Sequence, residues 1–155
     1  KMKITDILKK EHIIDSLVSV DKASTLEELS NFLKSKGLVF VKENLLNALM
    51  ERERLGSTGI GENVAIPHAK ISEIDQIVTI FARSIKGVEF DSLDKKPVHF
   101  IYLVLAPAKS SGQHLKVLAR ISRLLKNKSL REAIMSATET NQIYSIIADE
   151  DAKYI

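Results

Sequence analysis

The chain of 155 residues has no cysteine, so it can form neither disulfide bonds nor a reactive thiolate. It also has no apolar run near the roughly 20 residues that a membrane-spanning helix needs, and residues 1–5 lack the apolar core of a signal peptide. These absences are compatible with a reducing cytoplasm. We therefore expect a cytoplasmic protein that does not insert into a membrane.

Concentrated basic charge is missing as well. Lysine and arginine number 23 against 20 aspartate and glutamate residues, and the signs interleave, as in residues 51–54. The chain has no basic run with interleaved aromatic residues, no zinc-finger spacing and no ribonucleoprotein motif. Nucleic acid is therefore not an expected partner, and the net charge of +3 favours acidic protein partners or phosphate.

Short apolar runs alternate with amphipathic helical patterns, and no repeat or long linker divides the chain. This alternation predicts an α/β fold in which a mixed, mostly parallel sheet lies between helices, with one domain over residues 1–155. Strands are expected at residues 12–20, 64–66, 77–83, 88–90 and 98–105, the last of them central, covered on both faces and ended by Pro107. Helices are expected at residues 4–10, 42–54 and 141–149, with others starting near residues 24, 112 and 129.

Capping residues and apolar spacing refine the helices. The expected caps are Ser24 or Thr25, Ser111, and a capping box of Ser129 with Glu132. Gly37 and Gly56 are expected to terminate two of the helices. The apolar residues expected to face inward are Leu26, Leu29, Leu33, Leu45, Leu46, Leu49, Met50, Leu115, Leu118, Ile121 and Leu125.

Glycine is scarce, and half of it gathers in one segment before a histidine. Three of the six glycines lie at residues 56–61, just before the apolar run 64–66, which ends through Pro67 in His68. Glycine allows close approaches that a side chain forbids. A strand end stiffened by proline would place the imidazole of His68 at a fixed point on a sheet edge. The segment is equally consistent with a glycine-rich turn and an incidental histidine.

The four histidines differ in their settings. His12 lies among charged residues and is expected at the surface, whereas His99 opens an apolar strand and is expected to be a hydrogen-bonded structural residue. His114 falls in the first turn of its helix, where unpaired N–H groups and the helix dipole favour phosphate and lower the pKa of an imidazole. On this basis alone it is as consistent with a loop residue as with a functional one. His68 and His114 both lie at junctions where α/β folds assemble their sites.

Other chemistries find less support in the residues. No H-E-x-x-H pattern or suitably spaced carboxylate accompanies the histidines, so no metal is expected. No lysine follows the glycines as in a P-loop, and no strand precedes them as in a dinucleotide-binding motif, so no nucleotide cofactor is expected. A hydrolase that uses Ser57 and Asp91 stays open as an alternative.

The residues resemble a known family in four ordered blocks. The first two are R-E-x-x-G-S-T-G-I-G at residues 52–61 and V-A-I-P-H-A-K at residues 64–70. The others are F-D-S-L-D-x-x-P-V at residues 90–98 and Q-H-L-K-x-L-A-x-I-S at residues 113–122. Together they resemble the mannitol/fructose-type enzyme IIA domains of the bacterial phosphotransferase system, a class that includes the nitrogen-related regulatory IIA proteins. The chain departs from the pattern at Asn63, where many members carry glycine.

The resemblance implies a phosphoryl carrier that needs no cofactor. His68 would accept the phosphoryl group on Nε2 from the phosphocarrier HPr or its nitrogen-branch paralogue, with His114 as a second active-site histidine and Arg52 beside the site. The residues expected to bind the phosphoryl group in the glycine-rich segment are Ser57, Thr58 and Gly59, although the two hydroxyls are equally plausible as turn formers. Attack through Nε2 requires a proton on Nδ1, held by a group that the sequence does not identify.

The resemblance leaves the output open. The nitrogen-related regulatory branch is favoured because the chain carries no fused sugar-binding or membrane domain. A free-standing fructose- or mannitol-specific component would instead pass phosphate to the IIB component of a sugar permease, and a regulatory module would bind a target protein under control of the same histidine. Donor and acceptor must both dissociate quickly, so exposed apolar residues such as Ile60 are candidates for a small docking surface.

Overall fold

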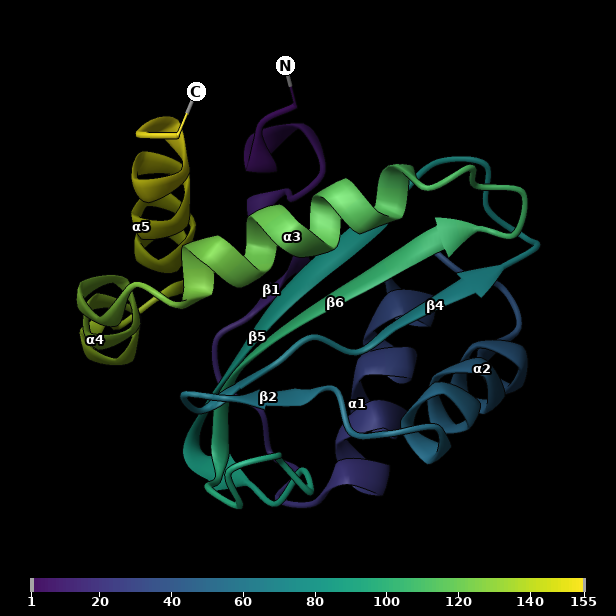
Figure 1. The fold of residues 1–155 in the computed structure, drawn as a ribbon, viewed down its shortest axis with the longest axis horizontal. Coiled ribbons are helices and arrows are strands. Elements are labelled where there is room, and N and C mark those ends of the chain that lie inside the picture. Colours follow the sequence, from purple (N-terminus) through teal and green to yellow (C-terminus); the bar gives the residue numbers. More distant parts are fainter. Residues whose placement is uncertain (1, 155) are drawn as a thin grey trace.

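A computed structural model describes residues 2–154, in which one sheet carries helices on both faces (Figure 1). The strands are β1 (Ile13–Ile14), β2 (Gly59–Gly61), β3 (Val64–Ala65), β4 (His68–Ile71), β5 (Val78–Val88) and β6 (Val98–Pro107). The helices are α1 (Lys22–Ser35), α2 (Lys42–Arg54), α3 (Gln113–Leu125), α4 (Lys128–Ser136) and α5 (Thr140–Ala152), and two 3-10 turns span Ile4–Asp6 and Lys10–His12. No helix among the described residues is both long and apolar enough to cross a membrane.

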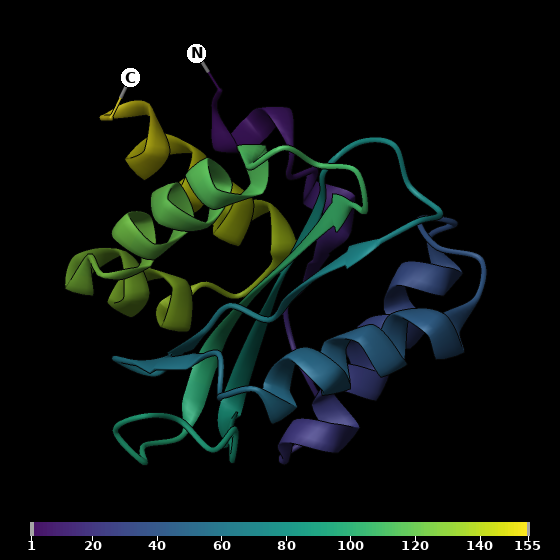
Figure 2. The same cartoon turned by 45° about the vertical axis from the view of Figure 1, so that its right-hand side comes forward.

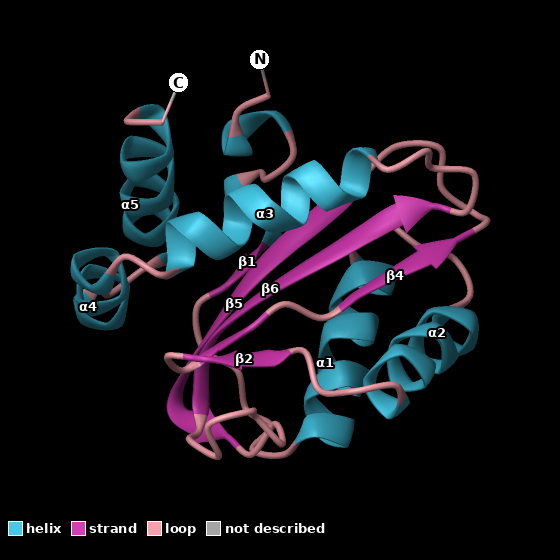
Figure 3. Cartoon of the chain, viewed as in Figure 1, coloured by secondary structure: helices cyan, strands magenta, loops and turns pink. Residues whose placement is uncertain are grey.

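The sheet is mixed, with the strand order β1-β5-β6-β3-β2 and with β4 also paired to β6. The long strands β5 and β6, prominent in Figure 3, run antiparallel. Parallel pairs join β1 to β5 and join both β3 and β4 to β6, while β2 adds an antiparallel edge to β3. The predicted α/β fold with a mixed sheet between helices is confirmed.

Side chains of β6 alternate between two hydrophobic cores. Tyr102 and Val104 pack in the core formed with α3, α4 and α5, whereas Leu103 and Leu105 pack in the core formed with α1 and α2. Figure 2 shows these two layers of helices on opposite sides of the sheet. Because both faces of β6 are buried, almost every residue from 98 to 105 is apolar, as expected of a central strand.

The N-terminal segment differs from the prediction. The helix expected at residues 4–10 is wrong, since the chain forms only a short 3-10 turn there and a second one later. Ile4 is buried, and its backbone N–H donates to the carboxylate of Asp151 at 2.8 Å. A tertiary contact with the last helix therefore decides the local structure at this end of the chain.

Two predicted strands are also corrected. The strand expected at residues 12–20 is limited to β1, because the carbonyl of Asp15 accepts a hydrogen bond from Nε of Arg83 at 2.8 Å and leaves the sheet ladder. The strand expected at residues 88–90 is not a separate element, since Val88 is the last residue of β5.

The start of α1 lies earlier than expected. Asp21 is its cap, with a carboxylate oxygen that accepts from the backbone N–H of Ser24 at 2.8 Å, so the prediction of Ser24 or Thr25 is wrong. The predicted end is confirmed. Gly37 has a left-handed φ of 72°, and its N–H donates to the carbonyl of Lys34 just after the helix ends.

The caps of α3 and α4 also differ from the prediction, the first lying one residue later and the second two residues earlier. Gly112 occupies the cap position of α3 in place of Ser111, with a φ of 103°. Asn127 caps α4 through its side-chain oxygen, so the capping box of Ser129 and Glu132 is wrong. Glu132 lies 4.0 Å from Lys128 at the surface instead.

Most residues expected to face inward are buried: Leu26, Leu29, Leu33, Leu45, Leu49, Ile121 and Leu125. Leu46 and Leu118 are half-buried. Met50 is 40% exposed and Leu115 is 61% exposed, so both of these predictions are wrong. A stripe that advances by three residues drifts around a helix with 3.6 residues per turn, and the buried face of α3 passes through Val117 rather than Leu115.

Asn63 forms the turn between β2 and β3 with a φ of 64°. Asparagine tolerates this left-handed conformation better than other residues with side chains. Its Nδ2 also donates to the carbonyl of Pro97 at 2.7 Å. Asparagine therefore fits this position, where many proteins of the resembled class carry glycine, without breaking the turn.

Candidate functional site

His68 is the first residue of β4, at an edge of the sheet, because β4 pairs only with β6 among the described strands. Ile66 and Pro67, the two residues between β3 and β4, belong to neither strand. The N–H of Ile66 donates to the carbonyl of Thr58 at 3.0 Å, and the carbonyl of Pro67 accepts from Val104 at 3.0 Å. These bonds fix the backbone on both sides of the bend, and the side chain of His68 is presented at a fixed point, as the sequence predicts.

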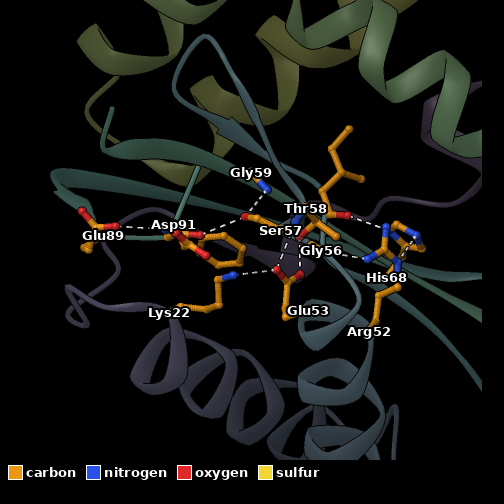
Figure 4. Close-up of polar contacts among 12 residues, drawn as sticks. Lys22, Arg52, Glu53, Gly56, Ser57, Thr58, Gly59, His68, Glu89 and Asp91 are labelled. Carbon is orange, nitrogen blue, oxygen red and sulfur yellow. Dashed lines mark hydrogen bonds and ion pairs between the residues drawn. The ribbon is translucent and has the colours of Figure 1, made fainter. Parts of the chain in front are cut away.

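The imidazole of His68 is held through both ring nitrogens (Figure 4). Nδ1 lies 2.8 Å from the carbonyl oxygen of Ile66, and Nε of Arg52 donates to Nε2 at 3.3 Å. A carbonyl can only accept and a guanidinium can only donate. The neutral ring therefore carries its proton on Nδ1 and its lone pair on Nε2, and the Ile66 carbonyl is the group that sets this tautomer.

Arg52 lies in the last turn of α2 and reaches a second acceptor. Its Nη1 donates to the carbonyl of Gly56 at 2.8 Å. Because the guanidinium is a planar fork, bonds from two of its nitrogens fix its orientation. The ion pair at this turn joins the neighbouring residues Arg54 and Glu51.

Burial lowers the pKa of His68 below the ordinary histidine value. The hydrogen bond to the Ile66 carbonyl opposes this change, whereas the positive charge of Arg52 adds to it. Glu53 raises the pKa and His114 lowers it, each by a smaller amount. The net direction is downward, so the ring stays neutral at physiological pH and keeps the lone pair on Nε2.

A cavity of about 380 Å³ joins the predicted catalytic residues. His68, Arg52 and His114 all line it, so the structure brings together side chains from β4, α2 and α3. His114 lies in the first turn of α3, with Nδ1 at 3.3 Å from the hydroxyl of Ser110. The remaining wall is mostly apolar and includes Ala48, Leu55, Ala69, Val104, Ala106 and Leu118.

Ser57, Thr58 and Gly59 use their polar groups within the glycine-rich loop. The Ser57 hydroxyl donates to the carbonyl of Phe90 at 3.0 Å and accepts from the N–H of Gly59 at 3.0 Å. Thr58 is buried, and both its N–H and its hydroxyl donate to the carboxylate of Glu53. None of the three lines the cavity at His68. These bonds favour the turn-forming alternative, and a phosphate contact by these residues stays a prediction.

The other histidines lie apart from this site. Nδ1 of His99 is 2.7 Å from the carbonyl of Ser84, in agreement with a structural role. His12 is half-buried and not a plain surface residue, and burial lowers its pKa. Within residues 2–154, no cluster of histidine and carboxylate side chains could hold a metal ion. The hydroxyl of Ser57 donates to a backbone carbonyl rather than to a histidine, which removes support for the hydrolase alternative.

The sequence interpretation missed Glu53 and Lys22. Glu53 is 7% exposed, and its carboxylate lies 3.0 Å from the ammonium group of Lys22. The signal for Glu53 was present, because Leu45, Leu49 and Glu53 follow one another at a spacing of four residues on one helix face. A carboxylate that continues an apolar stripe needs a buried partner. Nothing in the sequence marks Lys22 as that partner.

A family model described as "Phosphoenolpyruvate-dependent sugar phosphotransferase system, EIIA 2" matches residues 6–150, which include every residue of the site. The chain belongs to this family. It is a component of the phosphotransferase system with the role of a phosphoryl carrier, and the predicted resemblance is confirmed.

Relatives of this EIIA chain carry two kinds of name. This chain is 36% identical over 148 residues to the nitrogen regulatory protein of Bradyrhizobium diazoefficiens, and the match covers 95% of both chains. It is 33% identical over 128 residues to the fructose-specific EIIA component of Haloferax volcanii, covering 83% of both. The crystal structure of the nitrogen regulatory protein IIA-Ntr from Neisseria meningitidis matches with a TM-score of 0.85 and 33% identity, over 93% of this chain and 98% of that one. IIA mannitol from Escherichia coli, with a TM-score of 0.74 and 21% identity, shares the fold over 90% and 98%.

Proposed function

We propose that His68 is the residue that carries the phosphoryl group, on Nε2. The observation that supports this most strongly is the pair of contacts on its ring, with the Ile66 carbonyl at Nδ1 and the Arg52 guanidinium at Nε2. They leave the lone pair on Nε2, where it accepts from Arg52 beside the cavity, on a ring that burial keeps neutral. A neutral imidazole with an accessible lone pair is the form that attacks phosphorus.

The transfer forms one bond and breaks one. The Nε2 lone pair of His68 attacks the phosphorus of a phosphorylated donor protein in line with the leaving atom. The bond from phosphorus to the donor breaks, and its electron pair returns to the donor. The proton on Nδ1 stays in place throughout, since the Nδ1–H group donates a hydrogen bond to the Ile66 carbonyl before and after the step. Reverse attack by an acceptor protein releases the phosphoryl group in the same way.

Arg52 and His114 stabilise the charge of the transferred group. The incoming phosphorus takes the place on Nε2 that Arg52 occupies in the free protein, and the guanidinium then donates to phosphoryl oxygens while Nη1 keeps its bond to Gly56. His114 adds a polar ring from the first turn of α3, where the helix dipole also favours an anion. Ser57 and Thr58 hold the glycine-rich loop through their hydroxyls, and contact of Ser57, Thr58 or Gly59 with the phosphoryl group stays a prediction.

The donor is an HPr-like phosphocarrier, and the output is regulatory. Two relatives that match almost the whole chain are named nitrogen regulatory proteins, which supports this branch. The fructose-specific relative supports a second candidate, transfer to the IIB component of a sugar permease. A complex of the mannitol IIA and phosphorylated IIB proteins from Escherichia coli shares the fold, with a TM-score of 0.75.

The experiment is phosphorylation of the purified chain by phosphoenolpyruvate, enzyme I and HPr. We expect one acid-labile, alkali-stable phosphoryl group on the wild-type chain and on a His12→Gln control, and none on His68→Ala. Labelling of His68→Ala at the wild-type level would overturn the assignment. Adding purified IIB proteins then separates the outputs, since transfer to IIB supports the sugar branch and retention on the chain supports the regulatory one.

A further inference from the structure

The geometry points to Glu53 as a positioning residue that fixes both hydrogen-bond partners of the His68 imidazole. This inference rests on the proposed role of His68 as the phosphoryl acceptor. Glu53 does not line the cavity, and its carboxylate acts only through other residues. It follows Arg52 directly in the last turn of α2, with its side chain turned inward.

Three groups hold the carboxylate of Glu53 in the interior (Figure 4). The backbone N–H of Thr58 donates to it at 3.0 Å, and the hydroxyl of Thr58 donates to its other oxygen. The ammonium group of Lys22, from the first turn of α1, lies 3.0 Å from it and also stacks over the ring of Phe90 at 5.1 Å. Charged and polar partners on several sides hold the buried carboxylate in one position, and the carboxylate in turn holds Thr58.

The first connection to His68 passes through Thr58. Glu53 holds the backbone of Thr58, and the Thr58 carbonyl accepts from the N–H of Ile66 at 3.0 Å. The carbonyl of that same Ile66 accepts from Nδ1 of His68 at 2.8 Å. The position of the group that sets the histidine tautomer therefore depends on Glu53 through two hydrogen bonds.

The second connection passes through Gly56. Gly56 lies between Glu53 and Thr58, and its N–H donates to the backbone carbonyl of Glu53 at 3.0 Å. Its own carbonyl accepts from Nη1 of Arg52 at 2.8 Å, which orients the guanidinium toward His68. The bonds from Thr58 to the Glu53 carboxylate thus close the short loop whose Gly56 carbonyl accepts from Arg52. One buried carboxylate therefore fixes the positions of the hydrogen-bond partners of both imidazole nitrogens.

The test reads the tautomer of His68 directly, by the nitrogen-15 chemical shifts of its ring in the unphosphorylated chain. In the wild-type chain we expect the proton on Nδ1. Glu53→Gln keeps the size of the side chain but removes its charge and one acceptor oxygen, so we expect the form protonated on Nε2 to appear. We also expect phosphorylation to slow by about tenfold, the effect of losing roughly one hydrogen bond. If Glu53 had only a structural role, Glu53→Gln would lower thermal stability without changing the tautomer of the His68 ring.

Matched variants separate this effect from general damage. Glu43→Gln removes the same charge from an exposed position in the first turn of α2 and should leave the tautomer and the rate unchanged. If Glu53→Gln does not fold, Thr58→Val removes one bond to the carboxylate at constant shape and should shift the tautomer in the same direction. Thr58→Ser, which keeps the hydroxyl, should preserve the tautomer.

An unchanged tautomer in Glu53→Gln, or in Thr58→Val where that variant is needed, overturns the proposal. That result is distinct from a failure of the proposed function, because the ring shifts are read without a donor protein. The acceptor role of His68 is tested separately by the loss of labelling in His68→Ala.

Discussion

Nε of Arg52 donates to Nε2 of His68 across 3.3 Å, while Nδ1 of the same ring lies 2.8 Å from the carbonyl of Ile66. The two contacts are unequal. The bond at Nδ1 is short and would last through the proposed transfer, whereas the bond at Nε2 is at the long end of the hydrogen-bond range and would be replaced by the bond to phosphorus. A strong contact at Nε2 would protect the lone pair, and a weaker one aligns the ring without that cost.

Replacing Arg52 should slow phosphorylation while leaving the fold intact. A charged hydrogen bond to the phosphoryl group is worth roughly 1.5–3 kcal/mol, so we expect Arg52→Ala to reduce the rate by about tenfold to a hundredfold. Arg52→Lys keeps the charge but cannot bond Gly56 and the phosphoryl group together as a planar fork, so it should recover only part of the rate. Rapid-quench measurements of labelling provide the test. Arg54→Ala, at an exposed position paired with Glu51, is the control, and equal rates for all variants would remove Arg52 from the mechanism.

The lowered pKa of His68 should make stability depend on pH. Burial of its ring disfavours the charged form in the folded chain, so the unfolded chain binds the proton more readily below the ordinary value of about 6.5. The free energy of unfolding contributed by His68 is therefore complete above that value and is lost as the pH falls toward the lower pKa of the folded state.

Urea unfolding between about pH 7.5 and pH 5 checks this sign. The pKa of His12 is lowered by burial in the same direction, so it adds a slope of the same sign. His68→Gln should therefore reduce the pH dependence without removing it. Identical slopes for the two chains would show that His68 has the same pKa in the folded and unfolded states.

The sequence predicts the parts of the fold that depend on local pattern. The bounds of α2 agree with the prediction at both ends, because an amphipathic stripe runs from its start to a terminating glycine. The central strand β6 agrees because it is buried on both faces and therefore uniformly apolar. The segment at residues 12–20 fails because a distant side chain, that of Arg83, takes a backbone carbonyl out of the ladder. No local pattern carries that information.

In the candidate site, too, some groups can be predicted from the sequence and others become apparent only in the folded chain. The family blocks contain His68, Arg52 and His114, and the structure brings these three side chains together at one cavity. The group that sets the tautomer is a backbone carbonyl, that of Ile66, and any residue could supply it. Glu53 carries a signal in its spacing, but its partner Lys22 lies on another helix and becomes apparent only when the chain is folded.

Gly59 is explained by packing, and its substitution tests that explanation. A Cβ built at Gly59 would lie 2.9 Å from the backbone Cα of Ser92, which cannot move away as a side-chain tip could. We expect Gly59→Ala to lower the free energy of unfolding by about 1–3 kcal/mol, as overpacking does. Calorimetry measures the effect. A stable Gly59→Ala chain that no longer accepts phosphate would show instead that the glycine serves the approach of the phosphoryl group.

Docking of the donor should depend on an apolar residue at the rim of the cavity. Leu55 lines the cavity at His68 and is 73% exposed. An exposed leucine beside the cavity favours contact with an apolar patch on the donor, and burial of even part of a leucine side chain is worth about 1 kcal/mol. We expect Leu55→Ser to raise the KM for the phosphorylated donor by about fivefold to tenfold and to leave the rate at saturating donor unchanged.

The control is Phe40→Ser, because Phe40 is 74% exposed and lies before the opposite end of α2, about 20 Å along the helix from Leu55. It should change neither constant. A fall in the saturating rate of Leu55→Ser would contradict the docking role. Such a fall would mean that the Leu55 side chain, which lines the same cavity as Arg52, helps to hold the guanidinium in place.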